Sequence, residues 1–231
     1  MPPTPLSGAV PTPDADVIAT YAQALAGHDG DVLRIGDTPE LTAFGGIATP
    51  LTLPLPFEKD CFTAVIGDGV LNRLSYPDEI RTFFAECARV LVSGGVAALR
   101  VLTRPEYPEA IGEIHEHVMR RGIATFDTFK WRLATAVVAR DGNPNLSAQA
   151  IRENVDRLFF DRGALAEATG WPLAAIRSID TYKDETAVFS FPTLGQLRSA
   201  LPDALRLVRT LDTGTYELAD RCPLLVIERL Y

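Results

Sequence analysis

The stretch FTAVIGDGVLNRLSYPDEIRTFFAECARVLVSGGVAALRVL, residues 62–102, decides the fold. Phe62–Ile66 is an apolar run that a glycine ends, which is typical of a buried strand. Ser75 and Asp78 form an S-x-x-D cap that predicts the start of a helix, and Gly94–Gly95 predict its end. The helix carries one apolar stripe, made of Ile80, Phe83, Phe84, Cys87 and Leu91. With Val96–Leu102 as the next strand, the stretch is a βαβ unit, which implies parallel strands and a right-handed crossover.

Helices and strands on either side extend this unit into a larger sheet. A helix is predicted from Asp14 or Asp16 to about Ala26, and a short buried strand at Val32–Ile35. Toward the C-terminus, strands are predicted at Thr186–Phe191, Leu205–Leu211 and Leu224–Leu230. The last two are joined by DTGTYELADRCP and predict an antiparallel pair at the edge of the sheet.

The segment from Pro105 to Asp184, about 80 residues, is predicted to be helical and is longer than a simple crossover. We expect one domain over residues 14–231, with this segment inserted at about 105–184 as a helical cap over the carboxyl ends of the strands. Residues 1–13 are rich in proline and predict a flexible arm. The predicted cap helices are Pro108–Arg120, Phe126–Ala139, Ser147–Phe160, Ala164–Thr169 and Pro172–Tyr182.

The composition excludes several classes of protein. The 231 residues are 47% apolar and 23% charged, with a net charge of -8, and such a surface repels phosphate backbones and anionic membranes. Cys61, Cys87 and Cys222 are far apart without a C-x-x-C pair, which favours reduced thiols over a zinc site or a disulfide framework. No apolar run approaches the roughly 20 residues of a membrane span. The N-terminus lacks the pattern of a secretory signal, so we expect a cytoplasmic protein.

The segments LPLPFEKDCFTAVIGDGVLNRL and FFAECARVLVSGGVAALRV resemble class I S-adenosylmethionine-dependent methyltransferases. Family members commonly read leucine-proline-phenylalanine, an acidic turn, a phenylalanine-led strand, and a helix that ends in arginine-valine-leucine-x-x-glycine-glycine. Arg89–Leu91 and Gly94–Gly95 match that ending, and the resemblance covers about Asp31–Val101. It implies an α/β, Rossmann-like, mostly parallel sheet with an antiparallel C-terminal edge strand, S-adenosylmethionine as cofactor and a small-molecule substrate.

The stretch DVLRIGDTPELTAFGG, residues 31–46, departs from the family pattern. The family ends its first strand in an acidic residue followed by a glycine-x-glycine-x-glycine turn, whereas this chain has Arg34, Gly36, Thr38 and Glu40. Thr38 before a proline predicts a helix N-cap instead. The family then places a helix, a strand, a second helix and a second strand, but the segment from Asp37 to Thr52 has only 16 residues, too few for these four elements. We therefore expect a sheet that lacks one or two strands of its first half, and with them the acid that holds the cofactor's ribose.

The resemblance leaves the methionine half of the cofactor site in place. Its cofactor-binding residues would be Gly36, Asp37, Thr38, Asp68 and Gly69. Methyl transfer depends mostly on positioning, so no catalytic residue is assigned. The cofactor site is expected to be degenerate, and transfer activity to be weak or lost.

Candidate substrate-binding residues are Asn72, Lys130, Arg132 and Tyr182. Asp68 and Asn72 follow a strand at the edge where α/β proteins bind ligands, although Asp68 could equally cap the following segment. Lys130 and Arg132 flank an aromatic residue and could hold an acidic substrate, or could lie on a surface helix whose Trp131 is buried. His115 and His117 are two residues apart and point in different directions on a helix, so no metal site is predicted.

Two other functions remain open. The chain could be a non-catalytic partner subunit or scaffold of an active methyltransferase, and the edge beside the first strand could support a homo- or heterodimer. Alternatively, residues 165–179 have the spacing of a helix-turn-helix, which would make the chain a DNA-binding regulator. Its second helix offers only Arg177 and Lys183 as cations, against Asp180 and Asp184, so ordinary helical packing explains that segment better.

Overall fold

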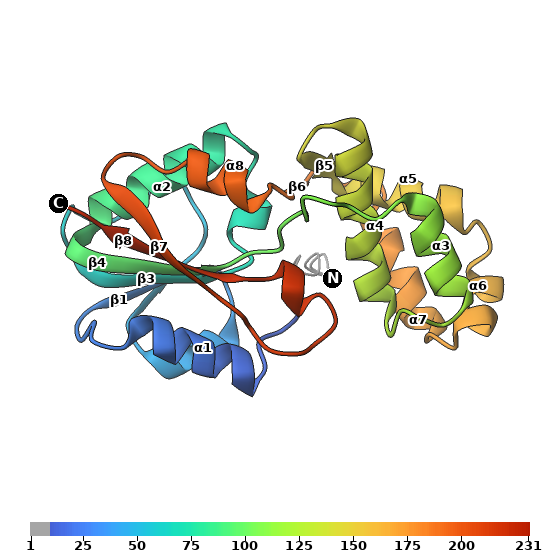
Figure 1. The fold of residues 1–231 in the computed structure, drawn as a ribbon, viewed down its shortest axis with the longest axis horizontal. Coiled ribbons are helices and arrows are strands. Elements are labelled where there is room, and N and C mark those ends of the chain that lie inside the picture. The colour runs from blue at the N-terminus through green and yellow to red at the C-terminus, as the bar shows by residue number, and fades with distance from the viewer. Residues whose placement is uncertain (1–9) are drawn as a thin grey trace. The chain divides into compact units, whose positions relative to one another are not determined.

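The computed structural model describes residues 10–231, which form two compact units (Figure 1). The sheet unit comprises residues 10–103 and 192–231, and the helical unit comprises residues 104–191. Of the predicted flexible arm, residues 1–9 lie outside the described residues, and Val10–Pro13 belong to the sheet unit.

The sheet unit contains a six-stranded sheet in the order β2-β1-β3-β4-β8-β7. β2, β1, β3 and β4 are parallel, whereas β8 is antiparallel to both β4 and β7. This confirms a mostly parallel, Rossmann-like sheet with antiparallel C-terminal strands. The strands are β1 Val32–Ile35, β2 Ile47–Thr49, β3 Phe62–Asp68, β4 Leu91–Arg100, β7 Leu205–Leu211 and β8 Leu224–Arg229.

β2 lies in the 31–52 region, where the sequence predicted that one or two strands of the first half are missing. After β1, the chain makes only the 3-10 helix η1 (Pro39–Phe44) before it returns beside β1. Gly45 and Gly46 have φ angles of 65° and 74°, and a Cβ on Gly46 would lie 2.0 Å from the Val32 carbonyl oxygen. Both positions favour glycine because of their positive φ, and Gly46 also because a side chain there would clash with the β1 backbone. Compared with the family pattern, one strand of the first half is absent, and β2 covers the predicted free edge of β1.

Helices cover both faces of this sheet, with α1 on one face and α2 and α8 on the other (Figure 1). Asp14 caps α1 (Ala15–Leu25), since its Oδ1 accepts the Val17 N–H at 3.0 Å. The opposite core contains Phe83 and Phe84 of α2 (Asp78–Val90). The remaining elements of the unit are α8 Leu194–Ser199, η2 Leu71–Arg73 and η4 Ala219–Arg221.

Both predicted ends of α2 are wrong in detail. The helix begins at Asp78 and has no side-chain capping hydrogen bond, so Ser75 is not its N-cap. The backbone N–H of Ser75 instead donates to Glu79 Oε2 at 2.6 Å. It ends at Val90 and β4 starts at once, so the two glycines lie inside the strand. Gly94, with a φ of 76°, lies where the pairing of β3 with β4 shifts register. The glycines form a strand irregularity and are not a helix stop.

The motif residues that carry the family resemblance have a structural role. The Arg89 guanidinium donates to the carbonyl oxygens of Phe57 (2.5 Å) and Leu55 (2.9 Å), while Glu86 Oε2 accepts the Leu55 N–H (2.7 Å). The hydrogen bond from Arg89 lowers the pKa of the Glu86 carboxyl. Arg89 and Glu86 thus hydrogen-bond the backbone of the LPLPF segment to α2. These motif residues therefore stabilise the fold, and their role here is not in a binding site.

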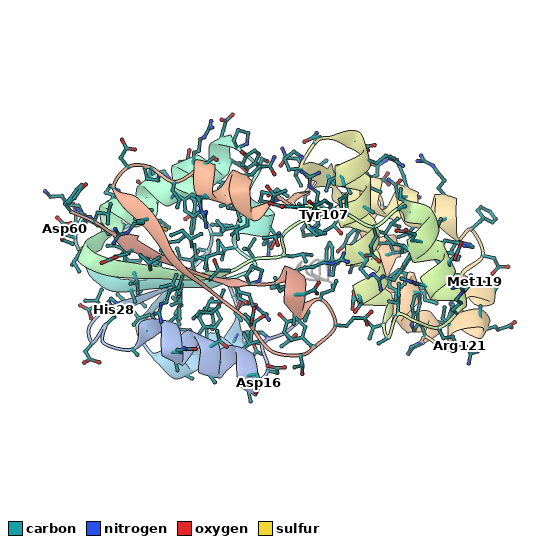
Figure 2. All side chains as sticks on the ribbon, in the orientation of Figure 1. Asp16, His28, Asp60, Tyr107, Met119 and Arg121 are labelled. Atoms are coloured by element: carbon teal, nitrogen blue, oxygen red, sulfur yellow. The ribbon has the colours of Figure 1, made fainter. Side chains whose placement is uncertain are left out.

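The helical unit confirms the predicted helices and contains a small sheet of its own. β5 (Asn145–Ser147) pairs antiparallel with β6 (Val188–Ser190), so the strand predicted at 186–191 is not part of the central sheet. Tyr107 and Met119 are exposed apolar side chains of this unit (Figure 2). In the described part of the chain, no helix has the length and apolar character that a membrane crossing requires. The helices are α3 Ile111–Met119, α4 Phe126–Asp141, α5 Ala148–Leu158, α6 Arg162–Thr169, α7 Leu173–Arg177 and η3 Ser178–Tyr182.

Candidate functional site

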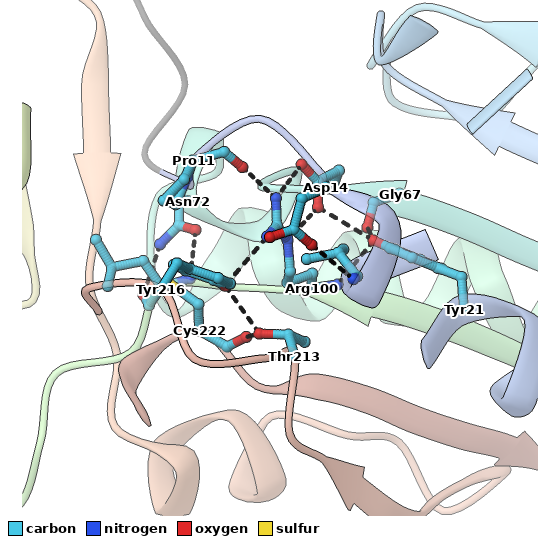
Figure 3. A network of polar contacts seen from close by, with 12 residues as sticks. Pro11, Asp14, Tyr21, Gly67, Asn72, Arg100, Thr213, Tyr216 and Cys222 are labelled. Carbon is cyan, nitrogen blue, oxygen red and sulfur yellow. Dashed lines mark hydrogen bonds and ion pairs between the residues drawn. The ribbon is translucent and has the colours of Figure 1, made fainter. Parts of the chain in front are cut away.

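The candidate site lies at the carboxyl ends of β1, β3 and β4 in the sheet unit. Asp68 is the last residue of β3 and Arg100 the last residue of β4, and the two are register partners. Neighbouring parallel strands that end together bring their terminal side chains to one edge of the sheet. Figure 3 shows Arg100 at the centre of a polar network.

Arg100 and Asp68 form a bidentate, fully buried ion pair. Nε of Arg100 donates to Oδ1 of Asp68 at 2.6 Å, and Nη2 donates to Oδ2 at 2.9 Å. The two side chains are 0% and 4% exposed. Sequence analysis missed Arg100, although a single cation in the apolar run VAALRVL was a usable signal, since a buried charge requires a partner.

Three further segments reach the ion pair. The Tyr21 hydroxyl of α1 lies 2.9 Å from the Gly67 carbonyl oxygen and 3.2 Å from Asp68 Oδ1. The Tyr216 hydroxyl accepts Nη1 of Arg100 at 3.1 Å, and the Pro11 carbonyl accepts Nη2. The network therefore joins the N-terminal segment, α1, two strand ends and the β7–β8 connection.

The protonation states follow from burial and from the pair itself. Burial lowers the pKa of the Arg100 guanidinium, but the hydrogen bonds and charge of Asp68 outweigh this and raise it, so the guanidinium stays charged. Burial raises the pKa of the Asp68 carboxyl, which the Arg100 hydrogen bonds oppose. Burial also raises the pKa of Tyr216 to about 12, so this phenol is neutral at physiological pH. The following segment η2 has no side-chain capping hydrogen bond, so the alternative that Asp68 caps it is wrong.

The N-terminal segment Val10–Pro13, called the strap below, packs on the end of β3. Val10 is 9% exposed, and Pro13 is buried. A Cβ added to Gly69 would lie 2.8 Å from Cγ2 of Val10, and Gly69 has a φ of 65°. Glycine is therefore required there for two reasons, its backbone conformation and the contact with the strap.

The turn after β1 offers less to a ligand than its sequence suggested. Gly36 has a φ of 88°, and its N–H donates to the Thr49 carbonyl at 2.9 Å. Asp37 is exposed. Thr38 precedes η1 as predicted, but its side chain makes no capping hydrogen bond. Cofactor binding by Gly36, Asp37, Thr38, Asp68 and Gly69 stays a prediction.

The predicted substrate-binding residues have several different environments. Asn72 in the sheet unit is fully buried, and its amide exchanges hydrogen bonds with the Leu102 backbone at 2.8 and 2.9 Å. In the helical unit, the Lys130 ammonium lies 2.6 Å from Asp127 and 5.3 Å from the centre of the Tyr182 ring. The structure therefore brings Lys130 and Tyr182 together in a buried cluster.

Arg132 belongs to a different cluster of the helical unit. Its guanidinium makes two hydrogen bonds to the Glu109 carboxylate, one at 3.0 Å and one shorter, and lies 2.8 Å from Nδ1 of His117. Trp131 is buried against Phe189 and Phe191, but α4 is not a surface helix, because most of its side chains are buried, Lys130 included. Substrate binding by Asn72, Lys130, Arg132 and Tyr182 stays a prediction.

The segment at 165–179 folds as a helical hairpin. α6 ends at Gly170, which has a φ of 79°, and α7 contains only the five residues Leu173–Arg177. Leu165, Ile176 and Ile179 of this segment are all buried. A helix of five residues, about one and a half turns, is too short to present several side chains to a major groove.

The part of the chain that the structure describes contains no group of three or more His, Cys, Asp or Glu side chains arranged to hold a metal ion. His115 instead stacks on Phe159, with ring centres 5.0 Å apart.

The strand order and directions define a mostly parallel, Rossmann-like fold with antiparallel C-terminal strands. Among solved structures, one provisionally described as a Zn-dependent alcohol dehydrogenase from Rhodobacter sphaeroides aligns at a TM-score of 0.53. It has 13% identity over 94% of this chain and 90% of its own. A SAM-dependent methyltransferase from Methanosarcina mazei aligns at a TM-score of 0.47, with 15% identity over 94% of this chain and 98% of its own. One from Mesorhizobium loti aligns at a TM-score of 0.44, with 15% identity over 93% of this chain and 98% of its own.

At these identities, the likeness concerns the fold alone. No protein-family model matches the chain, and no curated protein matches its sequence.

Proposed function

We propose that this chain is a methyltransferase-like protein that has lost methyl transfer and acts as a cytoplasmic binding protein or partner subunit. The fold of the sheet unit is retained, but the strand ends where the resemblance puts the cofactor are engaged with the chain's own residues. The observation that carries the proposal is the buried ion pair between Asp68 and Arg100.

The ion pair argues against a cofactor contact at Asp68. Its two oxygens already receive Arg100 and Tyr21, and its side chain is 4% exposed. A ligand would have to replace a bidentate, charge-assisted bond inside the protein, and the guanidinium would then be left as a buried, unpaired charge. The residue that the resemblance assigns to the cofactor thus serves the fold.

The neighbouring strands support the same proposal. β2 ends at Thr49, followed by Pro50, so the strand next to β1 has no terminal acid for a ribose. The Gly36 N–H is bonded to Thr49, and Val10 lies against Gly69. The residues present therefore do not fit S-adenosylmethionine, and we assign the chain no step of methyl transfer.

Isothermal titration calorimetry of the full-length protein with S-adenosylmethionine and S-adenosylhomocysteine tests the proposal. We expect no saturable heat up to millimolar ligand, since the Asp68 carboxylate is paired with Arg100 and Val10 lies against Gly69. A dissociation constant in the micromolar range would overturn the proposal and restore the alternative of an active, small-molecule methyltransferase.

A further inference from the structure

We propose that the ends of β3 and β4 form a peptide-binding site that this chain fills with its own strap. The partner it fits is an extended segment of another protein that carries a β-branched apolar residue directly before a proline. The inference rests on the proposed function, because a bound cofactor would need the same strand ends.

The apolar half of the site is the surface at Gly69. Val10 contacts this glycine so closely that a Cβ there would lie 2.8 Å from Cγ2 of Val10. The strap valine is 9% exposed, which is the burial of a core residue although it lies near the chain terminus. The missing side chain of Gly69 thus provides a recess that fits a small branched side chain.

The polar half of the site is the outer side of the Arg100 guanidinium. Nη2 donates to the Pro11 carbonyl as well as to Asp68, and the guanidinium is fully buried. Because Asp68 already balances the positive charge, the remaining hydrogen suits a neutral amide carbonyl better than a second carboxylate. A peptide carbonyl one residue after the recessed side chain meets this requirement.

A proline at the second position suits this site for two reasons. It has no N–H, so its burial leaves no backbone donor unsatisfied. It also holds the preceding residue in an extended conformation, so less conformational entropy is lost when the segment binds. Pro11 and the buried Pro13 give the strap both advantages.

The covalent link explains why the site is closed in the isolated chain. A short flexible connection gives a tethered segment an effective concentration in the millimolar range, which a free peptide at micromolar concentration does not match. Opening the site therefore requires a weaker strap, and Val10→Asp achieves this by placing a charge in the apolar recess. Thr12→Asp is the matched control, because it adds the same charge to the strap at an exposed position.

The experiment measures fluorescence anisotropy of a labelled peptide, AVPTPD, with three full-length proteins. We expect saturable binding to Val10→Asp, at least tenfold weaker binding to wild type and Thr12→Asp, and no binding of the peptide ADPTPD to any of them. Melting curves check that each variant is folded, and the milder Val10→Ser replaces Val10→Asp if that protein does not fold.

Two results would overturn the inference: no peptide binding to a folded strap variant, or equal binding to the variant and wild type. Calorimetry with S-adenosylmethionine on the same wild-type preparation separates this inference from the proposed function. Cofactor binding would refute the proposed function whatever the peptide does, whereas failure of the peptide alone leaves that function standing.

Discussion

Replacing Arg100 by methionine tests whether the buried ion pair holds the sheet unit together. Methionine keeps a long, flexible apolar chain but removes the guanidinium, so the Asp68 carboxylate is left 4% exposed without its cation. The Pro11 carbonyl and the Tyr216 hydroxyl lose their donor in the same step. The change thus affects the charge balance far more than the packing volume.

The expected cost follows from the burial of the pair. Removing one partner of a buried ion pair costs about 3–5 kcal/mol, because an uncompensated charge remains. This is a large share of the roughly 5–15 kcal/mol by which a domain is stable. The double variant Asp68→Leu/Arg100→Met removes both charges and leaves mainly the lost hydrogen bonds, at about 1 kcal/mol each. We therefore expect the double variant to be more stable than Arg100→Met.

The assay is urea unfolding, in which hydrogen exchange of peptides from β3 and β4 reports the unfolding of the sheet unit. Peptides from α4 of the helical unit are the internal control, since both tryptophans, Trp131 and Trp171, lie in that unit and fluorescence would miss the sheet. The reasoning is refuted if Arg100→Met costs less than about 1 kcal/mol, as an exposed pair would. It also fails if the double variant is less stable than the single one.

Three further predictions concern the same unit. Gly69→Ala should lower the melting temperature of the sheet unit more than Gly94→Ala does. Both glycines have φ near 70°, but only at Gly69 would an added Cβ have an atom within 4 Å. Equal losses of stability in the two variants would exclude the strap contact. Stability should fall as pH rises from about 9 toward 12, because burial raises the pKa of Cys222 and Tyr216 to about 12 and unfolding releases their protons. Cys222→Ala should make that decline shallower in urea midpoints measured against pH, and an unchanged slope would contradict this. Asn72→Ala should cost about 1–3 kcal/mol by calorimetry without aggregation, since it leaves two buried backbone groups unpaired, and a neutral result would refute that role.

Apolar periodicity was sufficient to predict the presence of the helices and the main strands, but not all of their ends. The stripe of α2, the buried run of β3 and the helices of the 104–191 unit follow from local apolar patterns, which the structure confirms. The ends of α2 were missed because a glycine pair signals a helix stop and a strand irregularity equally well in sequence. Here the register of β3 with β4, a long-range property, decides between them.

The short first half of the sheet was harder to predict for a related reason. β2 contains three residues between a glycine pair and a proline, which no local propensity identifies as a strand. It forms because Gly46 permits close approach to Val32, a contact that depends on the position of β1. Local sequence therefore indicated that one or two strands were missing but could not decide the number, and the structure shows one strand, β2, beside β1.

The sequence placed the candidate site at the strand ends, but the ion pair found there was not visible in the sequence. Asp68 was identified from its position after β3, whereas its partner Arg100 lies 32 residues away at the end of another strand. The strap and Tyr216 reach the same pair from opposite ends of the chain. Such a network depends on tertiary contacts. Its one local signal in the sequence was the isolated cation in an apolar strand, which was missed.

The most direct test of the account is an amide spectrum of the ¹⁵N-labelled full-length protein, titrated with S-adenosylmethionine to millimolar concentration. Gly36 and Gly69 report on the two strand ends, and the Arg100 Nε–H resonance reports on the ion pair. The account predicts that none of the three signals shifts with ligand, because the chain's own residues already occupy these groups. A saturable shift of both glycine signals, with loss of the Arg100 Nε–H resonance, would contradict it.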